Sequence, residues 1–180
     1  MRNLIVFAVL LIFAAHAQAA IPKKSDAPPG ITIESPEGFA LRNLSTKWFQ
    51  SPPPPEKVGI HMQFRSPDVK DGYQGLMTIR IDKETGNAKD VKQYVKKWLG
   101  DYQKLGYKVL GSKPFKQGSE LAYVIDVKNE KSKKQVRQVV FFRPNQAVVL
   151  TCIDKQKQFS KTLNECNNIT RSFAFLNSGK

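Results

Sequence analysis

One stretch in the second half of the chain, Leu121–Ile153, limits the possible folds more than any other. Within it, Leu121–Val127 alternates large apolar residues with smaller or polar ones, which is the period of a β-strand. Val136–Arg143 and Ala147–Ile153 carry consecutive apolar residues, as a strand does when both of its faces are buried. The polar segment Lys128–Lys134 suits a solvated turn between the first two strands. We therefore predict an antiparallel meander that needs cover on both faces.

Two segments elsewhere have the apolar spacing of amphipathic helices and are expected to provide this cover. The first is expected to begin at Asn87 as its N-cap, to run through Val91–Leu105 and to end at Gly106. The second is expected to span about Lys155–Phe173. The predicted fold class is α+β, with a central antiparallel β-sheet covered by one helix on each face, in other words an α/β/α sandwich.

Further strands are expected outside the meander. Val58–Phe64 and Met77–Ile81 alternate apolar and polar residues, so each should have one wet face and lie away from the covered middle of the sheet. Ile31–Ile33 is expected to form a short first strand, and Tyr107–Leu110 a strand after the first helix.

The first residues resemble a targeting segment. Arg2 precedes the apolar run Leu4–Ala15, and Ala17-Gln18-Ala19 then has the small-x-small form of a signal-peptidase site. We predict a signal peptide over residues 1–19, cleaved after Ala19, and a periplasmic or secreted protein. The apolar run is too short to cross a bilayer, so no transmembrane segment is predicted. Residues 20–30 are expected to be a flexible lead-in, 31–176 a single domain and 177–180 a frayed tail.

The chain has two cysteines, Cys152 and Cys166. An even number in an exported protein favours a disulfide, which here would join the third strand of the meander to the second helix. A bridge that closes a loop of this size contributes about 3 kcal/mol in the chain-entropy model. Two buried free thiols are the alternative.

The composition is strongly basic, with 29 Lys and Arg against 15 Asp and Glu. Outside the cytoplasm this charge favours an anionic lipid or glycan surface, or an acidic envelope protein, over nucleic acid. The alternative is that the charge only keeps the protein soluble. The positive residues are concentrated on the first helix and on the hairpin of the meander, and the candidate partner-binding residues are Lys92, Lys96, Lys97, Lys131, Lys133, Lys134 and Arg137.

Motifs for catalysis are absent from the sequence. No nucleophile elbow, P-loop or dinucleotide fingerprint occurs, and the only histidine after the predicted cleavage point is His61. We predict no catalytic residue, metal or cofactor. Two alternatives stay open: a hydrolase with its site near His61, and a carrier with an apolar pocket lined by Tyr94, Trp98 and Phe142.

Three short motifs carry a resemblance to a known family. They are the turn Ser35–Phe39, the helix end Lys104–Tyr107 and the final helix ending in Ile169–Phe173. With the order of elements, they resemble the PsbP-like superfamily, which includes extrinsic photosystem subunits and bacterial DcrB-like envelope proteins. The resemblance covers about Ile31–Phe175 and implies an antiparallel sheet between helices with a non-catalytic accessory or binding role. Many bacterial members resemble lipoproteins, whereas this chain lacks their lipobox cysteine.

The hypothesis is thus an exported, non-catalytic accessory or binding protein of the bacterial envelope. Its basic surface would contact an envelope protein or an anionic lipid or glycan surface, and its oligomeric state is left open.

Overall fold

The computed structural model describes residues 30–53, 55, 59–70 and 72–176 of the 180-residue chain. The predicted signal peptide, all of the predicted lead-in except Gly30 and the whole of the predicted tail lie outside the described residues. The elements of the described part are, in chain order, β1 (Ile31–Ser35), β2 (Phe39–Leu44), β3 (Phe49–Ser51), β4 (Ile60–Lys70), β5 (Tyr73–Asp82), α1 (Val91–Lys104), β6 (Lys108–Gln117), β7 (Glu120–Asn129), β8 (Lys134–Arg143), β9 (Gln146–Lys155), α2 (Phe159–Ser172) and β10 (Phe173–Phe175).

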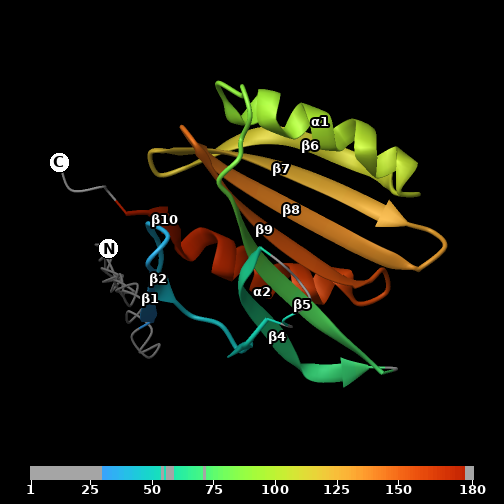
Figure 1. Ribbon diagram of the computed structural model, residues 1–180. Coiled ribbons are helices and arrows are strands. Elements are labelled where there is room, and N and C mark those ends of the chain that lie inside the picture. The colour runs from blue at the N-terminus through green and yellow to red at the C-terminus, as the bar shows by residue number, and fades with distance from the viewer. Residues whose placement is uncertain (1–29, 54, 56–58, 71, 177–180) are drawn as a thin grey trace, which may run out of the picture.

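Most strands belong to one twisted antiparallel sheet (Figure 1). Its order is β3-β4-β5-β9-β8-β7-β6, while β1, β2 and β10 form a small second sheet. The predicted meander is β7, β8 and β9, so that prediction is confirmed. The first five residues of β9, Gln146–Leu150, are all buried, as expected for the strand at the centre of a covered sheet.

The two helices cover opposite faces of the large sheet (Figure 1). Ile125 of β7 and Val149 of β9 belong to the buried cluster that contains Val95 of α1. Leu150, the next residue of β9, points to the other face and packs in the cluster that contains Ile169 of α2. The predicted α+β fold, with a sheet between two helices, is therefore confirmed. The small sheet adds a wall on the α2 side, where β2 also contacts α2.

Both helices begin later than the sequence predicts. The N-cap of α1 is Asp90, whose Oδ1 accepts a hydrogen bond of 2.8 Å from the backbone N–H of Gln93. The predicted cap, Asn87, is wrong, because it lies in the turn that precedes the helix. The predicted start of α2 at Lys155 is also wrong, because this residue continues β9 opposite Lys134.

Two strand predictions need correction as well. Met77–Ile81 belongs to β5, which pairs directly with the central β9, so the expected position away from the middle is wrong. Its alternation has another cause: α1 covers that face only in part, and the exposed Arg80 guanidinium lies 5.0 Å from the Trp98 ring centre. β6 extends well beyond the predicted Tyr107–Leu110. The prediction stopped short because β6 is an edge strand whose residues are mostly exposed, so its sequence shows no apolar alternation.

Candidate functional site

The predicted disulfide is confirmed. Cys152 of β9 and Cys166 of α2 are bonded, with an S–S distance of 2.07 Å, and both residues are buried. The bond fixes α2 to the central strand of the sheet.

The predicted basic residues on α1 lie on its exposed side. Lys92, Lys96 and Lys97 are all exposed, on the helix face turned away from the sheet. The end of α1 reaches the β7–β8 hairpin, since a Cβ built on Gly106 would contact Asn129. Lys97, the nearest of the three α1 lysines, is nine residues before Gly106, which at the helical rise of 1.5 Å per residue is about 13.5 Å. The helix lysines and the hairpin lysines therefore form two separate surfaces.

The hairpin lysines instead adjoin the start of β5. Lys134 of β8 and Lys155 of β9 are cross-strand partners, and their Nζ atoms lie 5.1 and 6.0 Å from the centre of the Tyr73 ring. Lys131 and Lys133 are exposed in the turn. We call this surface the hairpin end, and it consists of Lys131, Lys133, Lys134, Lys155 and Lys157.

Arg137 differs from the other predicted partner-binding residues because its charge is paired inside the fold. Its Nε and one terminal nitrogen each donate to Asp126 at 2.8 Å, and the other terminal nitrogen donates to Asn167 of α2 at 3.3 Å. Arg137 thus ties β7 and β8 to α2 and is largely occupied by that contact.

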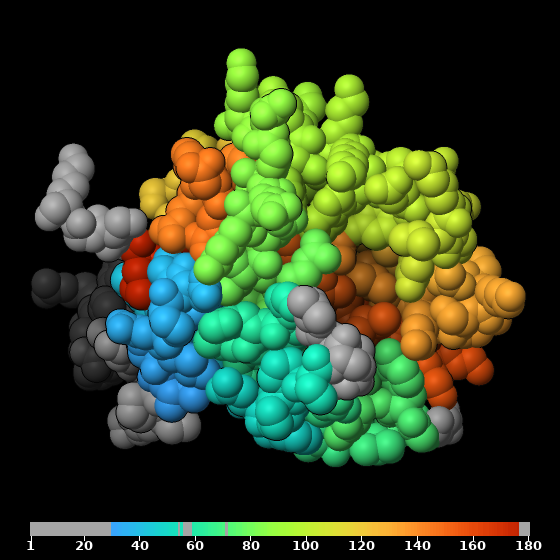
Figure 2. All heavy atoms as spheres, viewed as in Figure 1, coloured from blue at the N-terminus to red at the C-terminus, as the bar shows by residue number. Residues whose placement is uncertain are grey.

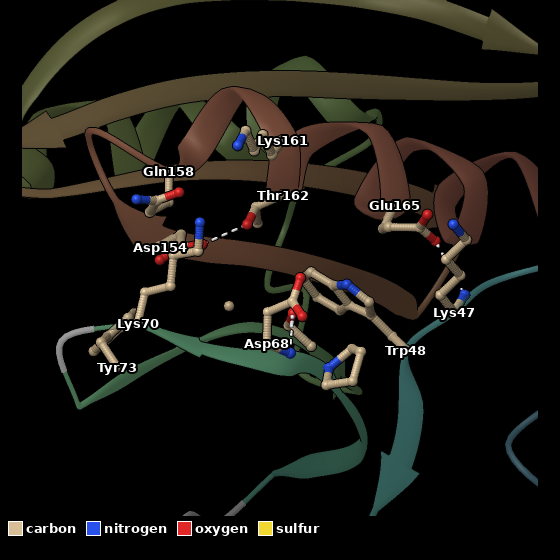
Figure 3. A pocket seen from close by; sticks show the side chains of 13 residues that line it. Lys47, Trp48, Asp68, Lys70, Tyr73, Asp154, Gln158, Lys161, Thr162 and Glu165 are labelled. Carbon is tan, nitrogen blue, oxygen red and sulfur yellow. Dashed lines mark hydrogen bonds between the residues drawn. The ribbon is translucent and has the colours of Figure 1, made fainter.

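Beside the hairpin end, a cavity of about 250 Å³ lies between β4, β5, the end of β9 and the first turns of α2 (Figure 3). Trp48, from the segment before β3, and Tyr73 contribute aromatic walls, while Asp154 and Thr162 contribute buried polar groups. None of these residues was among the predicted site residues. They come from distant parts of the sequence, and only the fold brings them together.

Gly75 determines the shape of the cavity. A Cβ at this position would lie 2.9 Å from Thr162 Oγ1, 3.0 Å from Asp154 Oδ2 and 3.2 Å from Trp48 Cζ2. Any side chain larger than hydrogen would displace these three groups. A glycine within a strand pattern is a sign of such a close approach, and it is the one feature of the sequence that hints at this cavity.

Asp154 is a buried carboxylate, only 6% exposed. The Thr162 hydroxyl donates a hydrogen bond to its Oδ2, and the backbone N–H of Lys155 donates to its Oδ1 at 2.6 Å. Within the described part of the chain, no lysine or arginine forms an ion pair with it. Burial raises the pKa of the nearby Tyr73 hydroxyl, and the charge of Asp154 adds to that rise.

The mouth of the cavity carries both signs of charge. Lys47, Lys70 and Lys161 line it and are exposed, as is Asp68. Glu165 is already engaged, because its Oε2 accepts hydrogen bonds from Thr46 Oγ1 at 2.8 Å and from the backbone N–H of Lys47 at 3.3 Å. The segment before β3 is thereby held against α2 (Figure 3).

The residues proposed for the alternative hydrolase site and for the alternative carrier pocket are engaged in contacts within the fold. His61 joins the two sheets, with Nε2 2.8 Å from Ser35 Oγ and its ring against Phe39. Tyr94 packs against both Trp98 and Phe142, at ring-centre distances of 5.1 and 5.8 Å. A hollow of about 400 Å³ adjoins Tyr94 and Trp98 and is lined by the polar loop before α1 instead of by Phe142.

The described residues include no group of three or more His, Cys, Asp and Glu placed to hold a metal ion. No helix in the described ranges is long and apolar enough to cross a membrane.

The cavity beside α2 combines carboxylate, hydroxyl and aromatic groups, a set that suits reversible binding of a ligand.

Comparison with known proteins shows which fold this chain has. No protein-family model matches this chain, and no curated protein matches its sequence. Among solved structures, the solution structure of cyanobacterial PsbP (CyanoP) from Synechocystis covers 86% of this chain and 99% of its own, with 13% identity and a TM-score of 0.53. LpqN of Mycobacterium tuberculosis, described as involved in cell envelope biogenesis, covers 84% of this chain and 87% of its own, with 12% identity and a TM-score of 0.61.

A third similar structure is PA94 of Pseudomonas aeruginosa, described as a protein of unknown function and putative regulator. It covers 78% of this chain and 93% of its own, with 14% identity and a TM-score of 0.55. At these identities the similarity is one of fold. The chain has a PsbP-like fold, as its short motifs predicted.

Proposed function

We propose that this protein is an exported, non-catalytic accessory protein of the bacterial envelope that docks on an anionic partner through the hairpin end. The observation that carries the proposal is the convergence of lysines from two segments, the β7–β8 turn and the end of β9, on the same edge of the molecule as Tyr73. Glu130 is the one acidic residue in the turn, and it pairs with Lys128 at 2.5 Å and with Lys133 at 4.0 Å. The exposed lysines therefore leave a local excess of positive charge.

Several observations support the location and class. The predicted signal peptide and the Cys152–Cys166 bond suit an oxidising compartment outside the cytoplasm. The similar structures include a PsbP protein and a protein described as involved in cell envelope biogenesis, which agrees with an accessory role. The sequence also lacks the motifs of the common enzyme families.

Binding to phosphatidylglycerol vesicles, an anionic envelope glycan and acidic envelope proteins tests the proposal. The variant Lys131→Glu/Lys133→Glu/Lys134→Glu should weaken binding at least tenfold, or about 1.4 kcal/mol. Wild-type binding should weaken as salt is added, because the contact is exposed and screened.

The α1 lysines offer a matched control. The variant Lys92→Glu/Lys96→Glu/Lys97→Glu changes the net charge by the same amount on the separate helix surface, and it should retain most of the binding. Equal losses in both variants would mean that overall charge, and not the hairpin end, governs binding. An affinity that changes neither with added salt nor in either variant would reject the proposal.

A further inference from the structure

The inner end of the cavity offers a carboxylate with unused hydrogen-bonding capacity. Asp154 accepts one hydrogen bond on each oxygen from the described residues, whereas a carboxylate has about four acceptor positions. A buried carboxylate is costly unless a cation or several donors compensate it. A primary ammonium group brings one positive charge and three donors, and so supplies what this position lacks.

The walls of the cavity favour the same group. Trp48 is 7% exposed and Tyr73 is half-buried, and both rings line the cavity. Lys134 and Lys155 already lie near the Tyr73 ring, so Trp48 is the wall considered for a ligand cation. Figure 3 shows the Trp48 ring and the Asp154 side chain entering the cavity from different elements. A cation beside the face of an aromatic ring is attracted by the ring's quadrupole.

The mouth favours the opposite charge. Lys47, Lys70 and Lys161 come from the segment before β3, from β4 and from α2, and all three are exposed at the opening. Asp68 and Glu165 line the same opening, and the neutral donors on Glu165 leave its charge in place, so these five side chains carry one excess positive charge. This excess of ammonium groups over carboxylates at the mouth disfavours a simple cation and favours a ligand with a carboxylate.

A volume of about 250 Å³ lies below the range of about 300–1,000 Å³ that is typical of pockets for drug-sized ligands, so the ligand is small. We infer that this cavity binds a small zwitterion, a free α-amino acid or a dipeptide. Its ammonium contacts Asp154 beside Trp48, and its carboxylate faces Lys70 and Lys161. The cavity adjoins the hairpin end at Tyr73, but the inference does not depend on the proposed docking.

Titration of the full, disulfide-bonded protein with glycine, L-alanine, D-alanine and dialanine tests the inference. The chain has two tryptophans, so Trp98→Phe leaves Trp48 as the only one and makes its fluorescence a reporter of the cavity. Calorimetry on the wild type provides an independent measurement. At least one of these zwitterions should bind with a Kd below about 1 mM.

Two probes with a single charged group each measure how much the ammonium and the carboxylate contribute to affinity. Acetate lacks the ammonium and ethylamine lacks the carboxylate, so each should bind at least tenfold more weakly than the best zwitterion. Asp154→Asn keeps the side chain's size and its acceptor for Thr162 while removing the charge, and should lower affinity at least tenfold. Lys161→Gln alters an exposed side chain at the mouth and should lower affinity several-fold.

Three results would overturn the inference: no signal with any zwitterion, ethylamine or acetate binding as tightly as alanine, or unchanged affinity in Asp154→Asn. Vesicle binding by the same variants is measured in parallel. Since the hairpin end lies outside the substitutions, retained vesicle binding with lost amino-acid binding separates this site from the docking surface.

Discussion

Gly75 illustrates how a single missing side chain can define a site. The position lies in β5 and is buried, where a strand normally gains from a β-branched or aromatic residue. Here the absence of a Cβ lets Trp48, Asp154 and Thr162 approach the backbone from separate elements. A residue that favours strands is therefore excluded at position 75, because the tertiary structure brings three side chains close to the backbone there.

The first prediction is that Gly75→Ala destabilises the protein. Its added methyl group would overlap Thr162 Oγ1 and Asp154 Oδ2, and overpacking of this kind costs about 1–3 kcal/mol. Urea denaturation measures the change in the free energy of unfolding. The control is Gly100→Ala on α1, where no atom lies within 4 Å of the new Cβ and the helix should gain about 0.5–1 kcal/mol. A neutral or stabilising Gly75→Ala would show that the surrounding groups relax freely.

A second residue-scale prediction concerns Tyr102. Burial raises the pKa of its hydroxyl, which donates to Gln138. In the unfolded chain a tyrosine ionises near pH 10. The folded state keeps the proton to higher pH, so its stabilising contribution is complete below about pH 10 and is lost as the pH rises above that value. Thermal denaturation between about pH 8 and 12 should therefore show stability that falls above about pH 10, with a shallower fall in Tyr102→Phe.

Lysines also titrate in this range, so the difference between the two proteins is the informative quantity. Tyr107→Phe is a suitable control, because Tyr107 is a neighbouring tyrosine whose ring meets the Tyr102 ring at a centre distance of 6.3 Å. Parallel pH profiles for wild type and Tyr102→Phe would contradict a raised pKa.

At the scale of elements, the sequence predicted helices and strands best where all residues of one face share the same burial. β8 and β9 are buried on both faces, and their consecutive apolar residues allowed them to be found. The helices were found from their apolar stripes, but their starts were not, because Asp90 and Asn87 are both good caps and only the path of the preceding turn selects Asp90. β6 was missed over most of its length because exposed edge residues carry no period.

The third prediction concerns the bond between β9 and α2. Cys152→Ser/Cys166→Ser should lower the free energy of unfolding by about 3 kcal/mol, because the unfolded chain regains the freedom that the cross-link removes. Chemical denaturation of the oxidised and substituted proteins measures this difference. A loss below about 1 kcal/mol would indicate that packing around Ile169 already holds α2 in place.

At the scale of the whole molecule, the candidate site could not be predicted because it has no continuous sequence signature. The cavity joins Trp48, Tyr73, Gly75, Asp154 and Thr162, and each alone reads as an ordinary core, strand or helix residue. The basic residues were visible in the sequence, but their grouping was not. The fold separates the α1 lysines from the hairpin and pairs Arg137 internally.

The large sheet also leaves β6 exposed as a ten-residue edge strand. Figure 2 shows α1, in yellow-green, on the upper side of the molecule. Unpaired backbone groups on such an edge can pair with another chain, and lysines or proline on the strand oppose this. Lys108, Lys113 and Lys116 are exposed on β6, and Pro114 between them lacks an N–H. These residues are of the kind that opposes pairing of an edge strand with a second copy.

The last prediction follows from this protection of the edge. Lys108→Thr/Lys113→Thr/Lys116→Thr should self-associate in a concentration-dependent manner, because threonine favours strands and no longer repels a second copy. Sedimentation velocity over a range of concentrations measures the change. Lys92→Gln/Lys96→Gln/Lys97→Gln removes the same charge from α1, where no strand edge exists, and should sediment like the wild type. Equal association of both variants would assign the effect to net charge, and association of neither would mean that Pro114 and the twist of β6 protect the edge without the lysines.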